Sequence, residues 1–240
     1  DCPSTYRVMK FGGSSLGDPE RLVRVVGIIG HEHETNGPVA IVVSAFGDTT
    51  ERLRSAVTAA AAGHIEPATQ IADTISQAAI DIGTRALQGL VPGADAAPVR
   101  AAVYERVEAL RSLLFGVSLV REMTPQTVDS VVSFGERIAS AVVAAVLTVS
   151  GRPAVAVDAR SWTVTDDAFG AALVDWEATQ SRLDALPRGA VASPSIPVSL
   201  AQRPMAEPPR WGAMGRTTRR RCSRAVFRRA RSCAGPMCPA

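Results

Sequence analysis

Aromatic residues and lysine are scarce in this chain of 240 residues. Phenylalanine, tryptophan and tyrosine make up 5% of the sequence, and Lys10 is the single lysine among 26 lysine and arginine residues. The hydrophobic content is nevertheless 46%, with alanine and valine dominant. The sequence therefore predicts a core packed from small aliphatic side chains, and its length allows one large domain or two small ones.

Cysteines and long apolar runs are also few. The four cysteines, Cys2, Cys222, Cys233 and Cys238, lie near the two ends and match neither a disulfide framework nor a zinc-binding spacing. The longest apolar run, 138–149, is too short to span a bilayer. No pattern of charged, apolar and small residues indicates a signal peptide. We therefore expect a cytoplasmic protein with no membrane partner.

Charge divides the chain into two unequal segments. Residues 193–240 contain ten arginines and one acid, whereas residues 1–192 carry more acids than bases. A change of this size predicts a boundary near residue 193. A basic arm of this kind could bind nucleic acid through phosphates. Because it lacks a binding motif, and only Trp211 and Phe227 interleave with its arginines, we disfavour a nucleic-acid partner.

A glycine turn follows the first apolar stretch, which the pattern predicts to be a strand over residues 6–11. The strand leads through Lys10 and Phe11 into Gly12 and Gly13, and a helical pattern opens at Asp18. Glycines can take positive φ and let a ligand approach the backbone. Free amides and the positive end of a following helix favour anions, and a compact ammonium adds charge. An ordinary turn with a surface lysine explains these residues equally well.

Alternating strands and helices predict an α/β fold. Residues 39–43 form an apolar run expected to be a strand buried on both faces, followed by the polar loop 44–50. Helical patterns cover 20–34, 51–62, 66–87 and 98–119, a helix start is expected at Thr124-Pro125, and 154–157 has the pattern of a third buried strand. Such alternation is typical of a parallel or mixed sheet covered by helices, with ligands at the carboxyl ends of the strands.

Two groups of charged residues have more than one interpretation. Glu136 and Arg137 precede a nearly all-apolar helix, where charges are costly unless they are paired or bind a ligand. Mutual pairing of Glu136 with Arg137 and use by a ligand both remain open. Asp166 and Asp167 could bind a divalent ion, although a solvated loop is the favoured interpretation.

Four consecutive motifs resemble those of aspartate kinase, in the amino-acid kinase superfamily. They are Lys10-Phe-Gly-Gly-Ser-Ser, Val42-Val-Ser-Ala-Phe-Gly-Asp-Thr-Thr-Glu-Arg-Leu53, Ser133-Phe-Gly-Glu-Arg137 and Val157-Asp-Ala-Arg160. The resemblance covers residues 6 to about 192. It implies the N-terminal part of a catalytic domain over residues 1–192, folded as a three-layer sandwich with a mostly parallel mixed sheet between helices.

The resemblance also implies a reaction and a set of site residues. Such enzymes transfer the γ-phosphoryl group of ATP, with Mg²⁺, to the side-chain carboxylate of L-aspartate, the first step towards lysine, threonine and methionine, and they form homo-oligomers. Phosphoryl transfer depends on positioning and charge neutralisation. Lys10 would neutralise the phosphoryl group, and Thr50 and Glu136 would hold aspartate, with Glu136 engaging its ammonium group. The remaining phosphate-binding residues implied are Phe11, Gly12, Gly13 and Ser44.

The family pattern stops near residue 190. There the resemblance predicts a strand with Thr-Gly-Phe and then a Leu-Gly-Arg-Gly-Gly-Ser-Asp-Tyr segment, but residues 193–240 contain neither and show no helical or strand period. We hypothesise a shifted reading frame that begins between about residues 188 and 196. The tail is then expected to be disordered, because it cannot bury enough apolar area, and kinase activity is expected to be impaired.

The genetic code allows the shift to be examined. Trp211 and Met214 each have one codon, ending in G, and each precedes a glycine. Reading one nucleotide earlier therefore forces glycine at both places. Permitted codons elsewhere give Leu-Gly-Arg-Asn-Gly-Ser-Asp-Tyr from residue 210 onward and Asp-Thr-Gly-Phe from residue 196 onward.

Overall fold

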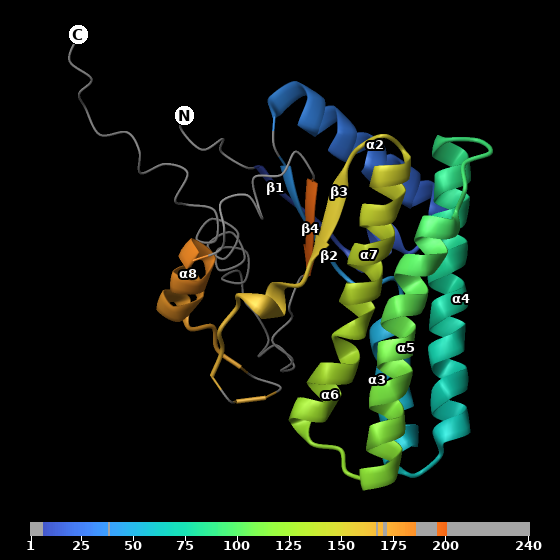
Figure 1. Ribbon diagram of the computed structural model, residues 1–240, viewed down its shortest axis with the longest axis vertical. Coiled ribbons are helices and arrows are strands. Elements are labelled where there is room, and N and C mark those ends of the chain that lie inside the picture. Colours follow the sequence, from blue (N-terminus) through green and yellow to red (C-terminus); the bar gives the residue numbers. More distant parts are fainter. Residues whose placement is uncertain (1–6, 38, 167, 170–171, 186–195, 201–240) are drawn as a thin grey trace, which may run out of the picture.

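A computed structural model describes residues 7–37, 39–166, 168–169, 172–185 and 196–200. Helices surround a small sheet (Figure 1). The elements, in chain order, are β1 Arg7–Phe11, α1 Gly13–Leu16, α2 Pro19–Asn36, β2 Val39–Val43, α3 Thr49–Ala61, α4 Ile65–Leu90, α5 Ala97–Val120, α6 Pro125–Val132, α7 Phe134–Val149, β3 Ala154–Val157, the short 3-10 helix η1 Ala159–Ser161, α8 Trp176–Ala185 and β4 Ile196–Leu200.

The four described strands are parallel and lie in the order β1-β2-β4-β3. The connections from β1 to β2 and from β2 to β3 move in the same direction across the sheet. Because such crossovers are right-handed, α2 and α7 cover one face. The return from β3 to β4 moves in the opposite direction, and α8 lies on the other side of the sheet from α7 (Figure 1). The described sheet is thus parallel, as predicted, with α2 and α7 packed on one face and α8 on the opposite side.

Burial differs between the strands. In β2, four of the five residues are buried and the fifth is half-buried, which confirms that this apolar run is a central strand. The prediction of a third buried strand is wrong in one respect: β3 forms, but it is half-exposed, and Val155 is 41% exposed. The reason is its position, since β3 pairs on one side only among the described strands.

The sheet contains a strand that the sequence did not predict. β4 lies between β2 and β3, with Val198 opposite Ile41 on one side and opposite Ala156 on the other. The expectation of no strand beyond residue 193 is therefore wrong. Strand pairing uses backbone groups, so position between two strands can outweigh a weak local pattern. Residues 201–240, on which the disordered-tail and nucleic-acid interpretations depend, lie outside the described residues.

Helices α3, α4 and α5 form a layer that agrees with the predicted helical stretches. Gly83 of α4 lies where a Cβ atom would be 2.6 Å from Val99 of α5 and 2.8 Å from Val142 of α7. The absence of a side chain there allows three helices to approach closely. At the start of α6, Thr124 accepts a hydrogen bond from the Thr127 amide, 3.1 Å away, as its predicted capping role requires.

The stretch 125–149, which joins α6 and α7, is the one described helical segment long and apolar enough to cross a membrane. In this molecule 72% of its apolar window is buried. Burial of this kind is typical of a core helix in a soluble fold and makes the stretch weak evidence for a membrane span. Its apolar character is explained by packing against α5, β3 and β4.

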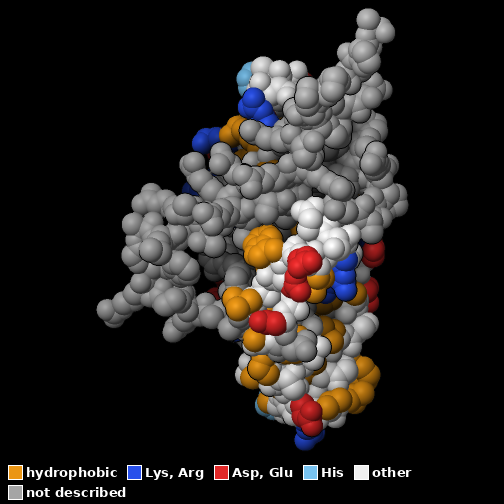
Figure 2. All heavy atoms as spheres, turned by 90° about the vertical axis from the view of Figure 1, so that its left-hand side faces the viewer, with side chains coloured by type: hydrophobic (Ala, Val, Ile, Leu, Met, Phe, Trp, Pro, Cys, Tyr) orange, Lys and Arg blue, Asp and Glu red, His pale blue; other side chains and the backbone are white. Residues whose placement is uncertain are grey.

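Exposed apolar side chains accompany charged ones at the lower end of the molecule in Figure 2. At this end α5 finishes, and its last turns and the segment after it expose four apolar side chains: Phe115, Leu119, Val120 and Met123. Residue Arg121 closes α5 in the left-handed conformation, with φ 57°. The end of the helical layer therefore exposes apolar side chains beside charged ones.

Candidate functional site

Two loops meet at the carboxyl ends of β1 and β2. The Ser44 amide donates a hydrogen bond of 3.2 Å to the Phe11 carbonyl oxygen. A Cβ atom on Gly13 would lie 2.4 Å from the Ala45 carbonyl oxygen, and one on Gly17 would lie 3.1 Å from the Gly47 nitrogen. The glycine turn after β1 and the polar loop after β2 are therefore in direct backbone contact, at the sheet edge where the sequence placed both.

The glycines serve this contact in a different way from the one predicted. Gly12 has φ −83°, and neither Gly12 nor Gly13 is among the described residues with positive φ, whereas Gly47 has φ 47°. Glycine is needed at position 13 because a side chain would collide with the opposite loop. The predicted helix opens at Asp18 as α2, but the four-residue α1, which the sequence did not predict, lies between the turn and α2. A helix this short contributes little dipole to the turn.

Lys10 is exposed at the end of β1, and its Nζ lies close to the glycine turn. A Cβ atom on Gly12 would be 3.6 Å from Nζ, an ordinary contact distance. The ammonium group thus stands over backbone that carries no side chain. This arrangement places a positive charge beside amides that a negatively charged ligand can approach.

The start of α7 forms the third side of the same region. A Cβ atom on Gly135 would be 2.8 Å from Ala45 Cβ and 3.5 Å from Thr49 Cγ2, so the first turn of α7 packs against the polar loop and the first turn of α3. Thr50 and Glu136 are half-buried in those first turns. The structure therefore brings the seven predicted site residues to one end of the sheet, on β1, the loops after β1 and β2, α3 and α7.

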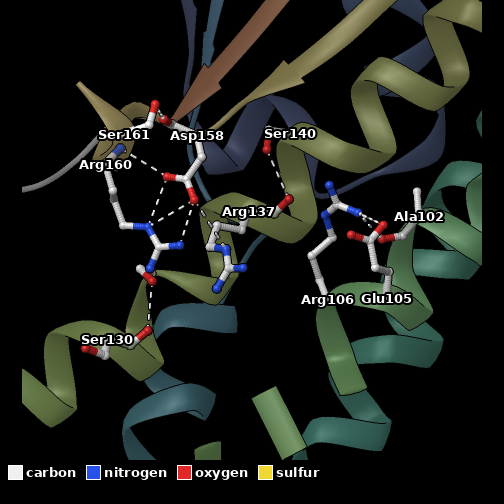
Figure 3. A network of polar contacts seen from close by, with 10 residues as sticks. Ala102, Glu105, Arg106, Ser130, Arg137, Ser140, Asp158, Arg160 and Ser161 are labelled. Atoms are coloured by element: carbon white, nitrogen blue, oxygen red, sulfur yellow. Dashed lines mark hydrogen bonds and ion pairs between the residues drawn. The ribbon is translucent and has the colours of Figure 1, made fainter. Parts of the chain in front are cut away.

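An arginine-rich network joins the start of α7 to the end of β3 (Figure 3). The Arg160 side chain donates to both oxygens of Asp158, with Nη2 2.6 Å from Oδ2 and Nε 3.0 Å from Oδ1, and the Arg160 amide donates to Oδ1. Arg137 Nε lies 3.8 Å from Asp158 Oδ2. The Arg137 guanidinium also stacks over the Phe134 ring, 4.1 Å from its centroid.

Burial and charge shift the titration of these three groups. Burial lowers the pKa of Arg137, and the positive charge of Arg160 lowers it further. Burial raises the pKa of Asp158, but hydrogen bonds from Arg160 and the charges of both arginines outweigh burial and bring the pKa below its usual value. The hydrogen bond to Asp158 raises the pKa of Arg160. Two cations thus share one carboxylate that stays ionised.

The network gives Arg137 a partner that the sequence did not suggest. Arg137 forms its ion pair with Asp158, which lies 21 residues beyond it in sequence. In the sequence, Asp158 and Arg160 belonged to the last of the four motifs that resemble aspartate kinase, but the resemblance gave neither residue a role. Their Asp-x-Arg spacing was the available signal, because an aspartate at such a position often bonds an amide two residues later.

Asp166 has a structural role in the loop before α8. Its Oδ1 accepts hydrogen bonds from the Leu173 amide at 3.0 Å and the Ala168 amide at 3.2 Å. Asp167 lies outside the described residues. Among the residues that the structure describes, no three histidine, cysteine or acidic side chains come together to form a metal site. The favoured interpretation of an ordinary loop therefore agrees with the contacts of Asp166.

A shallow groove of about 260 Å³ lies between α5, α7 and β3. It is lined mainly by alanines, with Arg106 among its polar residues. None of the predicted site residues lines it. The chemistry of the chain therefore gathers at the loop contact described above, where the groups are charged or polar, and not in this apolar groove.

A protein-family model, the amino acid kinase family, matches residues 5–191. The match covers more than half of the chain and includes β1, β2, β3 and all the predicted site residues. The chain therefore belongs to the amino acid kinase family.

Within this family, the chain is similar to aspartokinases. Aspartokinase 1, chloroplastic, from Arabidopsis thaliana is 33% identical over 162 residues, which cover 67% of this chain and 27% of that protein. An aspartokinase from Thermus thermophilus is 48% identical over 46 residues, 19% of this chain and 11% of the other. The bifunctional aspartokinase/homoserine dehydrogenase 2 of Escherichia coli is 30% identical over 64% of this chain and 17% of its own length. The chain spans about a quarter of the Arabidopsis protein.

Solved structures share the fold. The crystal structure of Escherichia coli aspartokinase III in complex with aspartate and ADP superimposes with a TM-score of 0.63 at 22% sequence identity. The match covers 80% of this chain and 40% of that one. The similarity confirms the predicted amino-acid kinase fold, of which this chain contains part.

Proposed function

We propose that this chain carries the nucleotide and acceptor sites of an aspartate kinase, which transfers the γ-phosphoryl group of ATP to the side-chain carboxylate of L-aspartate. One observation carries the proposal: Gly13 approaches the Ala45 carbonyl so closely that the Lys10 turn and the β2 loop form one surface. The aspartokinase relatives, and the related enzyme bound to aspartate and ADP, support it.

On this surface, Lys10 and the backbone of Phe11, Gly12 and Gly13 would contact the nucleotide phosphates, together with Ser44. The ammonium group would neutralise charge that accumulates on the transferred phosphoryl group, which is the main requirement of such a reaction. Mg²⁺ would be held largely by the phosphates, because this ion commonly binds through substrate phosphates and one or two carboxylates.

Thr50 and Glu136 would hold the acceptor. In support of this role, both residues are half-buried in the first turns of α3 and α7, and Gly135, next to Glu136, packs on the polar loop. A carboxylate can bind the α-ammonium group of an amino acid through charge-assisted hydrogen bonds. In this arrangement Glu136 would recognise the ammonium group and leave the side-chain carboxylate of aspartate free to face the phosphates.

The proposed activity has consequences for the pathway, the compartment and the assembly of the enzyme. We infer that the enzyme acts in the cytoplasm in the first step towards lysine, threonine and methionine, and that it assembles as a homo-oligomer. The names of the relatives support the biosynthetic role. Cysteine usage supports the cytoplasmic setting. We also propose that turnover by this chain is impaired, since residues 193–240 lack the Thr-Gly-Phe and Gly-Gly-Ser-Asp-Tyr segments.

Nucleotide binding by the full chain tests the proposal. We expect Lys10→Met to weaken binding of a non-hydrolysable ATP analogue, which keeps the γ-phosphoryl group, by roughly tenfold or more, the usual effect of losing a hydrogen bond to a charged group. The matched control is Arg85→Gln, which removes a cation from the exposed surface of α4. Isothermal titration calorimetry would measure both. Equal affinity of wild type and Lys10→Met would contradict the role of Lys10, and robust formation of aspartyl hydroxamate would contradict impaired turnover.

A further inference from the structure

We propose that Arg137, held by Asp158 and Arg160, is a positioning residue that fixes the direction of Glu136 in the acceptor site. The proposal rests on the function proposed above, because it concerns how that site distinguishes an amino acid from a plain dicarboxylate. Neither Arg137 nor Asp158 is assigned a contact with the substrate. Both act through the first turn of α7.

The first turn of α7 is held from two sides. On one side Gly135 packs on Ala45, so that even a methyl group at position 135 would approach Ala45 Cβ to 2.8 Å. On the other side Arg137 stacks on Phe134 and reaches Asp158 at the end of β3. Glu136 lies between these two residues in sequence. Its backbone is therefore located by the β2 loop through one neighbour and by β3 through the other.

The second attachment depends on Arg160. The guanidinium group of Arg160 donates to both Asp158 oxygens, and its amide donates to Oδ1, so the carboxylate has little freedom to turn. Arg137 meets this fixed carboxylate at 3.8 Å (Figure 3). Arg160 thus holds the Asp158 carboxylate at the end of β3, and this carboxylate in turn holds α7 through Arg137.

Fold stability alone does not explain this network. The Arg137 side chain is 22% exposed, and the charge of Arg160 opposes its own. Charges in such surroundings often contribute little net stability, because desolvation offsets their attraction, yet they can specify one arrangement. The network lies beside Glu136, the proposed ammonium-binding carboxylate. We therefore infer that the network holds Glu136 in one position.

The positioning of Glu136 should make the site prefer L-aspartate over succinate. Recognition of an α-ammonium group requires the Glu136 carboxylate at hydrogen-bonding distance, and a displacement of about 1 Å can remove most of the benefit. Succinate has both carboxylates of aspartate but no ammonium group. The ratio of the succinate Kd to the L-aspartate Kd therefore measures how well Glu136 is placed, whereas the ADP Kd measures the rest of the site.

The experiment uses the full chain and titrates L-aspartate, succinate and ADP by NMR or calorimetry. Wild type should prefer L-aspartate over succinate, and Glu136→Gln should abolish the preference. We expect Asp158→Asn and Arg137→Gln to lower it by roughly fivefold or more with little change in the ADP Kd, and Arg137→Lys to restore part of it. Arg160→Gln, at a more exposed position, provides a third variant that tests the same attachment with less risk to folding.

The matched control is Arg111→Gln. Arg111 also joins two elements through two carboxylates, Asp73 of α4 and Glu108 of its own helix α5, but neither carboxylate belongs to the site loops or to α7. Its loss should leave the preference unchanged. An unchanged preference in Asp158→Asn, Arg137→Gln and Arg160→Gln, with Glu136→Gln impaired, would overturn the positioning role alone. A wild type without preference for L-aspartate would overturn both this role and the proposed acceptor site.

Discussion

Steric exclusion by the opposite loop restricts position 13 to glycine. Gly13 and Gly12 are neighbours with similar sequence signals, yet their surroundings differ. A Cβ atom on Gly13 would meet the Ala45 carbonyl oxygen at 2.4 Å, whereas one on Gly12 would meet only Lys10 Nζ at 3.6 Å. Backbone atoms cannot move aside as a flexible side chain can. Position 13 therefore admits no side chain unless the two loops separate.

Alanine substitutions should reveal this difference. We expect Gly13→Ala to lower the free energy of unfolding by about 1–3 kcal/mol, the usual cost of inserting an atom into a packed site. Gly12→Ala is the matched control and should change stability by less than about 0.5 kcal/mol, as substitutions without steric conflict do. Urea denaturation followed by circular dichroism measures both. Equal stabilities of the two variants would show that the loops can separate without cost.

The same reasoning applies to whole helices. The periodic patterns of α3, α4 and α5 predict helices with apolar faces but not their spacing. Gly83 sets that spacing, because its missing side chain leaves room for Val99 and Val142. A methyl group added to Gly116 of α5 would instead point into open space, with nothing within 4 Å of it. The two glycines look alike in sequence and differ only in what lies opposite them.

Alanine is therefore expected to change stability differently at these two glycines. Alanine in a helix interior gains about 1 kcal/mol over glycine, so Gly116→Ala should stabilise the protein. At Gly83 this gain is opposed by contact with two buried valines, costing about 1–3 kcal/mol. Gly83→Ala should thus be less stable than Gly116→Ala in thermal unfolding. A higher melting temperature for Gly83→Ala than for Gly116→Ala would mean that α4 can shift freely.

The whole molecule combines two segments of unlike charge and one continuous sheet. β4 comes from the arginine-rich segment but pairs between β2 and β3. Strand pairing satisfies backbone amides and carbonyls whatever the side chains. A shifted reading frame upstream of residue 196 is therefore compatible with a strand at 196–200, and the presence of β4 does not decide the origin of the segment.

The gene sequence tests that origin. If the frame shifted, the nucleotides of residues 196–223 read one position earlier should encode Thr-Gly-Phe and then Gly-Ser-Asp-Tyr without a stop codon. The frame one position later is the control and should encode neither. Sequencing the locus measures this, and a stop codon in the earlier frame over this span would refute the hypothesis.

Local sequence determined β1, β2, β3 and the helices α2 to α7, together with the strand-end loops and the residue types of the candidate site. Periodicity and turn residues carry that information, and it was enough to place Lys10, Ser44 and Glu136 on three separate segments. Only the tertiary structure decided that Gly13 touches Ala45, that Arg137 pairs with Asp158, and that β4 enters the sheet beside β2. These contacts join residues tens of positions apart, and a hydrophobic pattern specifies which face is buried but not which partner covers it.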